Sequence, residues 1–586
     1  MERELGWKVG GEQGAGIDST GEIFAWAMHR LGYYIFAYRH FMSRIKGGHT
    51  NYKIRVADHA VSHHGDAVHL LVAFDDETVR VNWREVVEGG IVIVDEAAGE
   101  CSPVDRREVS LLRVPLTELA KEAGGAIMKN MVAVGVTAAI VGLVPEDFLS
   151  VIDERFGKKG REVVQSNLNA VRKGYEYYNA NFSSHIALPP RPVAVAQDHL
   201  YISGNEAVAM GALAAGCRVL AQYPITPATE VMYWLVKHLP EYGGVVVQAE
   251  DEIAAVNMAI GANYGGTRAM TCTSGPGFSL MMEALGLAGM SETPLVIVDV
   301  QRSGPSTGLP TKTEQSDLLE ALYGSHGEFP RIVLAPTSVE QCFDYAVRAF
   351  NLAETYQCPV IVATDLYMGM SKSSTDRLNV NAVEIERGKL LPDEELSGVS
   401  RGSFKRYELT EDGISPRAIP GQRGGRFIAL GNEHDEFGFE MEDQAMRRSQ
   451  MDKRARKLRA FKGHDALSAT GPSDARLVLV GFGSTKGVID EARQVLTQLG
   501  VHVSHVHLGM LAPFPAEALR EYVERAETVL VVEVNSKGQL ADQIRLHLGH
   551  HAKIQSCLKY DGDPLLVAEI LERVNEVMSV GSAGRF

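Results

Sequence analysis

Along the chain, short apolar runs typical of buried strands alternate with stretches in which apolar residues have helical spacing. Short apolar runs, such as residues 70–74 and 91–94, have the length and composition of buried strands. Other stretches have helical spacing; in residues 488–499 apolar side chains occupy positions i, i+4, i+7, i+8 and i+11, which form one helix face. Strands that alternate with helices predict an α/β protein whose sheets are mostly parallel.

The same pattern divides the chain into parts. Residues 1–190 form a first α/β part, which opens on the glycine-rich turn GGEQGAG and leads into the proline-bearing stretch ALPPRPVAVAQ, a predicted linker. Residues 200–372 form a second part, whose apolar runs suit strands covered by helices on both faces. Residues 471–586 form a third α/β part.

Residues 373–470 differ from these three parts. They are polar, contain glycine and proline, show little strand pattern and close with the charged segment MRRSQMDKRARKLRAF. Because a run of charges is usually solvated, we expect an irregular connector that ends in a solvent-exposed helix.

Length, charge and cysteine spacing restrict the class of protein. A chain of 586 residues exceeds one hydrophobic core, and its net charge of −16 argues against nucleic acid or an anionic membrane as a partner. The longest apolar run, residues 131–144, is too short to span a bilayer and predicts a buried helix. With no signal-peptide pattern at the N-terminus, we expect a cytoplasmic protein. The six cysteines lack any C-x-x-C spacing, so we expect reduced and mostly buried thiols.

Polar motifs follow several predicted strands, where ligands bind in open α/β sheets. In YPITPATE, two prolines stiffen a loop that can direct the Thr226 hydroxyl at a ligand, although Thr226 and Thr229 can equally serve the turn and the next helix. In QAEDEIAA, acids at the start of a helix are favoured by its dipole. One of them in a cleft of low dielectric would have a raised pKa and could share a proton with a ring nitrogen.

Two further motifs follow in order. TSGPG allows close approach of the backbone to a ligand, or simply a tight turn. In QRSGPSTGLPT, Arg302 ends an apolar strand, so it is not expected to be a freely solvated charge. A guanidinium group binds a carboxylate through two parallel hydrogen bonds.

Together, YPITPATE, EDEIAAVNMAIGA, TSGPG and QRSGPSTGLPT closely resemble the α subunit of 2-oxoacid:ferredoxin oxidoreductases. Residues 1–190 look like the family's γ domain, fused at the N-terminus. RYELTEDGISPRAIPG and NEHDEFG look like its connector, and VLVGFGST and VEVNSKGQLADQI look like its transketolase-C-like domain. The resemblance implies three mostly parallel α/β domains, the second of which binds the pyrimidine of thiamine diphosphate.

The resemblance also implies roles for individual residues. The family's glutamate lies nine residues before the glycine of a Gly-Ala pair, as Glu252 lies before Gly261, so Glu252 is the expected partner of the aminopyrimidine N1′. Thr226 and Arg302 match the residues that contact the 2-oxoacid. The other positions implied on the substrate and cofactor sides are Tyr223, Ile225, Thr273, Ser274 and Gly275.

The implied reaction is the reversible oxidative decarboxylation of 2-oxoglutarate to succinyl-CoA and CO2, with coenzyme A as co-substrate and ferredoxin as electron acceptor. Pyruvate or another 2-oxoacid stays open as the substrate. The chain has no G-D-G segment followed by Asn and no cysteine cluster. We therefore expect the Mg²⁺–diphosphate half of the thiamine site and a [4Fe-4S] cluster on a β subunit, in an (αβ)2 heterotetramer.

Two rival classes of protein remain to be weighed. A transferase of the transketolase kind should contain its own diphosphate domain, and a non-catalytic scaffold would not need Thr226, Glu252 and Arg302.

A second substrate carboxylate needs its own cation, because an unpaired buried charge is costly. In the γ-like part, Arg44, Lys46 and His49 are candidates for that cation, although this segment can also be an ordinary solvated loop.

Overall fold

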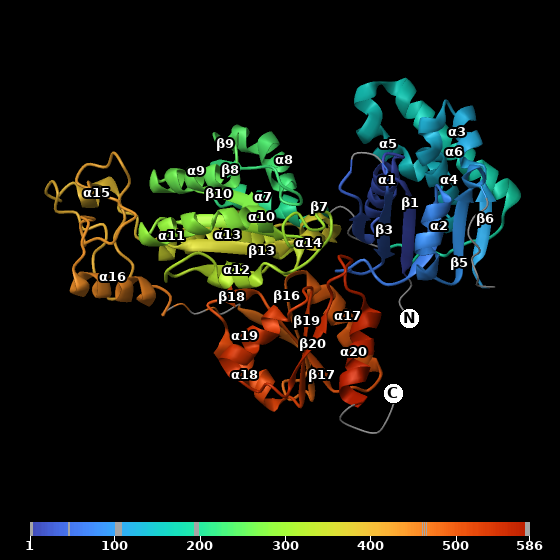
Figure 1. Cartoon of the computed structure of the whole chain (residues 1–586). Coiled ribbons are helices and arrows are strands. Elements are labelled where there is room, and N and C mark those ends of the chain that lie inside the picture. Colours follow the sequence, from blue (N-terminus) through green and yellow to red (C-terminus); the bar gives the residue numbers. More distant parts are fainter. Residues whose placement is uncertain are drawn as a thin grey trace. The chain divides into compact units, whose positions relative to one another are not determined.

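The computed structural model describes residues 4–44, 47–99, 108–192, 199–459, 461, 463 and 466–579. They form two compact units (Figure 1). One unit comprises Met1–Ile202 with Ser371–Arg377, and the other comprises Ser203–Met370 with Leu378–Phe586.

The first unit is built on a mixed eight-stranded sheet. Its strands, in spatial order, are β6 (Ser110–Val114), β5 (Val86–Asp95), β4 (Val68–Ala73), β1 (Leu5–Glu12), β3 (His49–Ala57), β2 (Tyr34–His40), β14 (Lys372–Thr375) and β7 (Leu200–Ser203). Strands β1, β4, β5 and β6 are parallel, whereas β3 pairs antiparallel with β1 and β2.

The helices of this unit include the buried one that the sequence predicts. They are α1 (Ile17–Arg30), α2 (Asp76–Asn82), α3 (Leu116–Glu122), α4 (Lys129–Val141), α5 (Leu149–Phe156) and α6 (Arg161–Asn181). Every residue of α4 from Met131 to Val141 is buried, which confirms the prediction. Burial on all sides explains why this helix has no polar face.

Strand β14 was not expected in the first unit. It pairs antiparallel with β2, opposite Phe36 and Ala37, although the sequence pattern placed Lys372 at the end of the second α/β part. Its residues, Lys-Ser-Ser-Thr, have no apolar alternation, so the pattern gave no indication of a strand.

The second unit contains a seven-stranded sheet that carries all four motifs singled out above. Its strands, in spatial order, are β18 (Met510–Ala512), β12 (Ile332–Leu334), β13 (Pro359–Asp365), β11 (Leu295–Gln301), β10 (Ala269–Thr273), β8 (Val219–Gln222) and β9 (Val245–Gln248). All pairs are parallel except β12 with β18, a strand contributed by the C-terminal part of the chain. The accompanying helices are α7 (Gly204–Ala214), α8 (Thr229–His238), α9 (Glu252–Tyr264), α10 (Gly275–Leu280), α11 (Met282–Met290), α12 (Leu318–Tyr323), α13 (Val339–Tyr356) and α14 (Leu366–Met370).

A five-stranded sheet completes the second unit. Its order is β15 (Leu467–Thr470), β17 (Val503–Leu508), β16 (Leu477–Phe482), β19 (Thr528–Glu533) and β20 (Ile554–Leu558), parallel except for β15. Figure 1 shows α18 (Ala516–Arg525) and α19 (Gln539–Leu548) on one face, and α17 (Lys486–Gln498) and α20 (Val567–Ser579) on the other. The predicted class, α/β with three mostly parallel sheets, is thereby confirmed.

Between β14 and β15, the connector is irregular apart from a short 3-10 helix (Val380–Ala382), α15 (Asp393–Leu396) and α16 (Gln444–Arg456). The prediction that its closing helix is solvent-exposed is wrong for one face of α16. Gln450, Lys453 and Arg454 of α16 are buried, and so is Lys457 directly after it. Arg447, Arg448 and Asp452 are exposed, so this run of charges forms one solvated face and one face whose charges are compensated inside the protein.

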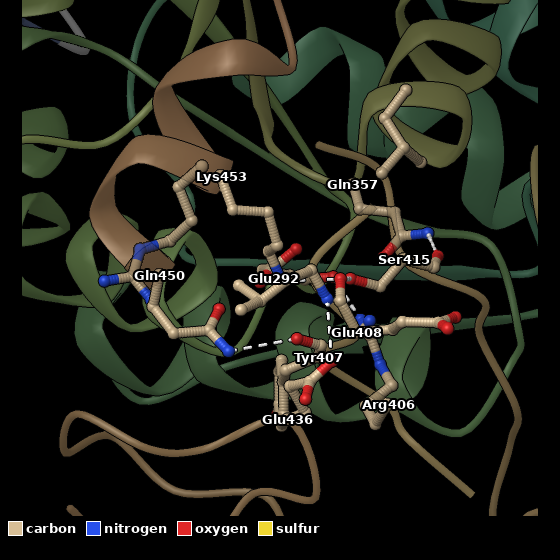
Figure 2. Close-up of polar contacts among 12 residues, drawn as sticks. Glu292, Gln357, Arg406, Tyr407, Glu408, Ser415, Glu436, Gln450 and Lys453 are labelled. Atoms are coloured by element: carbon tan, nitrogen blue, oxygen red, sulfur yellow. Dashed lines mark hydrogen bonds and ion pairs between the residues drawn. The ribbon is translucent and has the colours of Figure 1, made fainter. Parts of the chain in front are cut away.

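The compensating group is Glu292, which follows α11 and is fully buried. Its carboxylate binds Lys453 Nζ at 2.6 Å and Lys457 Nζ at 2.7 Å, and all three side chains are 0% exposed. Arg406 Nη2 donates to the carbonyl oxygen of Glu292 at 2.7 Å, and Gln450 Nε2 donates to that of Tyr407 at 3.0 Å (Figure 2). Burial alone would raise the pKa of Glu292, but Lys457 and Lys453 outweigh it and hold that pKa well below its ordinary value.

Two smaller expectations concern thiols and membranes. The five cysteines in the described part of the chain are buried and unbonded, as expected; Cys101 lies outside the described residues. Among the helices that the structure describes, none is both long and apolar enough to cross a membrane.

Candidate functional site

The four motifs begin at the carboxyl ends of neighbouring parallel strands. YPITPATE follows β8, the acidic motif follows β9, TSGPG begins at the end of β10, and QRSGPSTGLPT begins at the end of β11. Because β9, β8, β10 and β11 lie side by side and run parallel, all four motifs meet at one edge of the sheet. This edge is where open α/β sheets bind ligands.

The loop after β8 is held by side chains from three other positions. Arg302 Nη1 donates to the carbonyl oxygen of Thr226 at 2.8 Å, and Asn205 Nδ2 donates to that of Pro227 at 2.9 Å. Gln222 Nε2 donates to the carbonyl oxygen of Ala228 at 3.0 Å. A loop fixed in this way keeps Thr226 and the neighbouring Ile225, both half-buried, in one position relative to Arg302.

The ends of this loop decide one of the open alternatives. Helix α8 begins at Thr229, and its N-terminus has no side-chain cap hydrogen bond, so the alternative in which Thr229 caps this helix does not hold. Tyr223, at the start of the loop, is 40% exposed. It is therefore available to a ligand or a partner chain rather than being a core residue.

The three consecutive acids after β9 have different surroundings. Asp251 caps α9, accepting a hydrogen bond from the Ala254 backbone amide at 2.7 Å, and Glu250 is exposed. Glu252 is only 6% exposed. The helix dipole and cap account for Asp251, whereas burial of Glu252 without an ion pair in the described part of the chain has no such structural explanation.

Glu252 lies against the TSGPG segment. A methyl group on Gly277 would lie 2.2 Å from Thr273 Oγ1 and 2.5 Å from Glu252 Oε1, both far inside van der Waals contact. Only glycine fits at this position, because the Glu252 carboxylate occupies the space of a side chain. The glycine therefore serves close packing, and Glu252 and Thr273 converge at one point.

Arg302 lies on the wall of a cavity of about 640 Å³ next to this point. The cavity is lined by residues that include Gly275, Arg302, Ser303, Ser306, Asp317 and Tyr560. Arg302 is 7% exposed, and burial lowers the pKa of its guanidinium, although the group stays charged at neutral pH. One nitrogen is used to hold the Thr226 carbonyl, and Nε has no partner within the described residues, so donors remain for a ligand.

Sequence reasoning missed two carboxyl groups at this edge, Asp299 on β11 and Asp317 just before α12. Asp299 is fully buried, and neither of its carboxylate oxygens has a hydrogen-bond partner within the described residues. Burial, with Glu320 and Glu314 nearby, raises the pKa of Asp317 to about 7. A detectable signal existed for Asp299, because an acid in the apolar strand LVIVDVQ is uncommon.

Comparisons with known proteins agree with this architecture. Residues 210–454 match the family described as pyruvate flavodoxin/ferredoxin oxidoreductase, thiamine diphosphate-binding. Residues 6–177 match pyruvate ferredoxin/flavodoxin oxidoreductase, and residues 475–570 match pyruvate:ferredoxin oxidoreductase core domain II. The 2-oxoacid:ferredoxin oxidoreductase 2, subunit alpha, of Aeropyrum pernix is 36% identical, over 98% of this chain and 97% of its own length. The chain belongs to the family of 2-oxoacid:ferredoxin oxidoreductase α subunits.

Other relatives of this α subunit carry more specific names. The 2-oxoglutarate oxidoreductase subunit KorA of Mycobacterium tuberculosis is 34% identical over 96% of this chain and 90% of its own. A solved structure is that of 2-oxoglutarate:ferredoxin oxidoreductase from Magnetococcus marinus with 2-oxoglutarate, coenzyme A and succinyl-CoA bound. It has a TM-score of 0.90 and 37% identity, covering 98% of this chain and 100% of that chain. The resemblance inferred from the motifs is confirmed, and the designation as an α subunit implies further subunits.

The three candidates for a second carboxylate site belong to the first unit of the α subunit, whereas Thr226, Glu252 and Arg302 belong to the second. Arg44 is exposed, and Lys46 lies outside the described residues. His49 is 9% exposed, and its Nε2 lies 3.1 Å from Asn82 Nδ2. Burial lowers the pKa of His49, so this ring is uncharged at neutral pH.

Metal ligands complete the description of the candidate site. Over the described ranges, no group of three or more His, Cys, Asp or Glu side chains is arranged to hold a metal ion. The candidate site comprises Arg302, the buried Glu252 and the hydroxyl groups of Thr226 and Thr273.

Proposed function

We propose that this α subunit catalyses, together with a β subunit, the oxidative decarboxylation of 2-oxoglutarate to succinyl-CoA and CO2, with ferredoxin as electron acceptor. The observation that carries the proposal is the buried Arg302 on the cavity wall, joined to Thr226 beside the buried Glu252. The names of the relatives favour 2-oxoglutarate. The alternative is the same chemistry on pyruvate or another 2-oxoacid.

The residues at the sheet edge fit the pyrimidine half of thiamine diphosphate. Glu252 is buried, and its carboxylate packs against Gly277 and Thr273, so it can share a proton with a ring nitrogen in a site of low dielectric. We assign Ile225, Thr273, Ser274 and Gly275 to the same half-site; Ser274 Oγ is buried and has no partner within the described residues. Bound thiamine diphosphate would supply the electron sink for loss of CO2.

Arg302, Thr226 and Tyr223 are assigned to the 2-oxoacid. The guanidinium presents parallel donors to the substrate carboxylate, and the fixed loop positions the Thr226 hydroxyl beside it. Holding the carboxylate in one orientation fixes the orientation of the carbon–carbon bond that breaks during decarboxylation. With thiamine diphosphate bound, the Glu252 carboxyl group would hydrogen-bond to a nitrogen of the cofactor's pyrimidine ring.

Arg302→Lys is expected to raise the KM for the 2-oxoacid and to lower kcat. An ammonium group cannot hold the Thr226 carbonyl and present two parallel donors at the same time. Losing one charge-assisted hydrogen bond costs roughly 1.5 kcal/mol, which corresponds to about a tenfold rise in KM. Initial rates of the reconstituted complex with a viologen acceptor measure both constants. Unchanged kinetics would exclude Arg302 as the carboxylate-binding residue.

We assign the missing functions to a β subunit. It would carry Mg²⁺ with the diphosphate of thiamine diphosphate and the [4Fe-4S] cluster, and it would dock ferredoxin, in a cytoplasmic (αβ)2 complex. The sequence has no G-D-G segment followed by Asn and no cysteine cluster, which supports that division. We also keep the division of the chain into residues 1–190, 200–372, 373–470 and 471–586 as a proposal.

For the second carboxylate of 2-oxoglutarate, we propose a cation from the segment that holds Arg44, Lys46 and His49. Arg44 is preferred over His49, because burial keeps the His49 ring uncharged at neutral pH. The cavity beside Arg302 is lined by Glu314, Asp317 and Glu320, which would repel a second carboxylate.

The substrate panel is the experiment that tests the proposed function. The reconstituted complex is expected to prefer 2-oxoglutarate to 2-oxobutyrate and pyruvate. Arg44→Ala is expected to weaken that preference by about tenfold or more, because the second carboxylate of bound 2-oxoglutarate would lose its cation. Preference of the native complex for pyruvate would refute the substrate. Full selectivity in Arg44→Ala, Lys46→Ala and His49→Ala alike would refute the segment. The isolated chain, expected to be inactive, is the control.

A further inference from the structure

Two carboxyl groups at this edge of the sheet, those of Asp299 and Asp317, interact with each other. Asp299 is fully buried on β11, and Asp317 lines the same cavity as Arg302. Both oxygens of Asp299, and Oδ2 of Asp317, are buried without a hydrogen-bond partner among the described residues. In the described part of the chain, neither carboxyl group makes an ion pair within 4.0 Å, and Arg302 makes none either.

Two such groups cannot both be ionised at low cost. Burial disfavours the charged form of each, and each charge repels the other, so the pair retains a proton into the neutral range. The groups that act on Asp317 are Glu320 and Glu314, which favour its neutral form, and Arg302, which favours its charged form. Asp317 in turn favours the neutral form of Asp299. Glu314 differs from the pair, because it accepts a hydrogen bond from Ser303 Oγ at 2.9 Å.

We propose that Asp317 is a positioning residue whose proton controls how strongly Arg302 binds the substrate carboxylate. The inference rests on the proposed function of Arg302. When Asp317 is neutral, one competing anion fewer lines the cavity beside the spare donors of Arg302. When Asp317 is ionised, its charge attracts the guanidinium and repels the substrate carboxylate in the same cavity, where charges are poorly screened.

The direction of the pH dependence follows from this arrangement. Anion binding favours the protonated form of Asp317, so binding weakens as pH rises through the pKa of about 7 that burial and the neighbouring acids give Asp317. KM for the 2-oxoacid should therefore increase above neutral pH. The rate constant kcat should change less, because Asp317 does not touch the bond that breaks.

The experiment compares KM and kcat of the reconstituted complex between pH 6 and 8.5. In the native complex, KM is expected to rise by about fivefold to tenfold over this range, as for a titrating group near the binding site. Asp317→Asn, which cannot ionise, should keep the low KM throughout. Glu517→Gln on α18, an exposed acid that does not line the cavity, is the control and should keep the native profile.

A second variant keeps the inference testable if Asp317→Asn fails to fold. Glu320 raises the pKa of Asp317, so Glu320→Gln should move the rise in KM to lower pH without abolishing it. A flat KM profile in the native complex, or a native profile in Asp317→Asn, would overturn the inference. Arg302→Gln separates the two proposals. If this variant has an unchanged KM, the proposed function of Arg302 fails. If its KM is raised while Asp317→Asn keeps the pH dependence of KM of the native complex, only the inference about Asp317 fails.

Discussion

Replacing Glu252 by Gln is expected to lower kcat of the reconstituted complex by about 10²–10⁴-fold, the usual contribution of one acid–base group. The amide fills the same space against Gly277 and Thr273, so the packing of the sheet edge is retained. What is lost is a group able to hold and return a proton. Assembly with the β subunit, measured by size-exclusion chromatography, should be unaffected.

The matched control is Glu250→Gln, two residues away. Glu250 is exposed at the start of the same helical segment, so removing its charge should leave kcat close to that of the native complex. An inactive Glu250→Gln beside an active Glu252→Gln would show that the wrong acid was chosen. Loss of activity in both variants with loss of assembly would point to a structural role for the acidic motif.

Glu292→Gln is expected to destabilise the second unit by about 3–5 kcal/mol, the usual cost of removing one partner from a buried ion pair. Lys453 and Lys457 would remain buried next to a neutral amide, each with only one hydrogen bond to another oxygen, Ser415 Oγ and the Gln357 carbonyl oxygen. Thermal unfolding measures the loss of stability. Limited proteolysis shows whether residues 378–459 open first.

Two comparisons define what Glu292 contributes. Glu527 pairs with Arg476 on the surface, at 2.8 Å and more than half exposed, so Glu527→Gln should hardly change the unfolding temperature. Adding Lys457→Met to Glu292→Gln should recover part of the lost stability, because one uncompensated cation is removed. Equal unfolding temperatures for Glu292→Gln and Glu527→Gln would contradict the structural role of this cluster.

Much of the architecture followed from the sequence, because the second and third sheets are built from strands with uninterrupted apolar runs. Strand β11 and its parallel neighbours are buried on both faces, which leaves a clear pattern. The motifs at the strand ends were equally detectable, since the carboxyl edge of a parallel sheet brings them together. Of the three consecutive acids, Glu252 is buried, whereas Glu250 and Asp251 are exposed. The proposed role of Glu252 at the cofactor ring requires such a buried position.

The parts that could not be predicted depend on long-range partners. Lys453 and Lys457 are buried because Glu292 compensates their charges. The sequence pattern could not indicate this, because Glu292 lies more than a hundred residues away along the chain. Strand β14 is polar and short, and only its hydrogen bonds to the neighbouring strands β2 and β7 define it as a strand. The carboxyl pair at the cavity likewise depends on Asp317, whose loop gives no periodic signal.

The strand β14 also changes how the two units can be separated. The main chain leaves the first unit after Ile202, returns after Met370 and leaves again after Arg377. A protease that cuts at any single one of these crossings would leave the units covalently joined through the others. A fragment ending at Ile202 would lack β14, so β2 would present an unpaired edge with free backbone donors and acceptors. Such edges template pairing between molecules, and the fragment would be prone to aggregate unless residues 371–377 were supplied as a separate peptide.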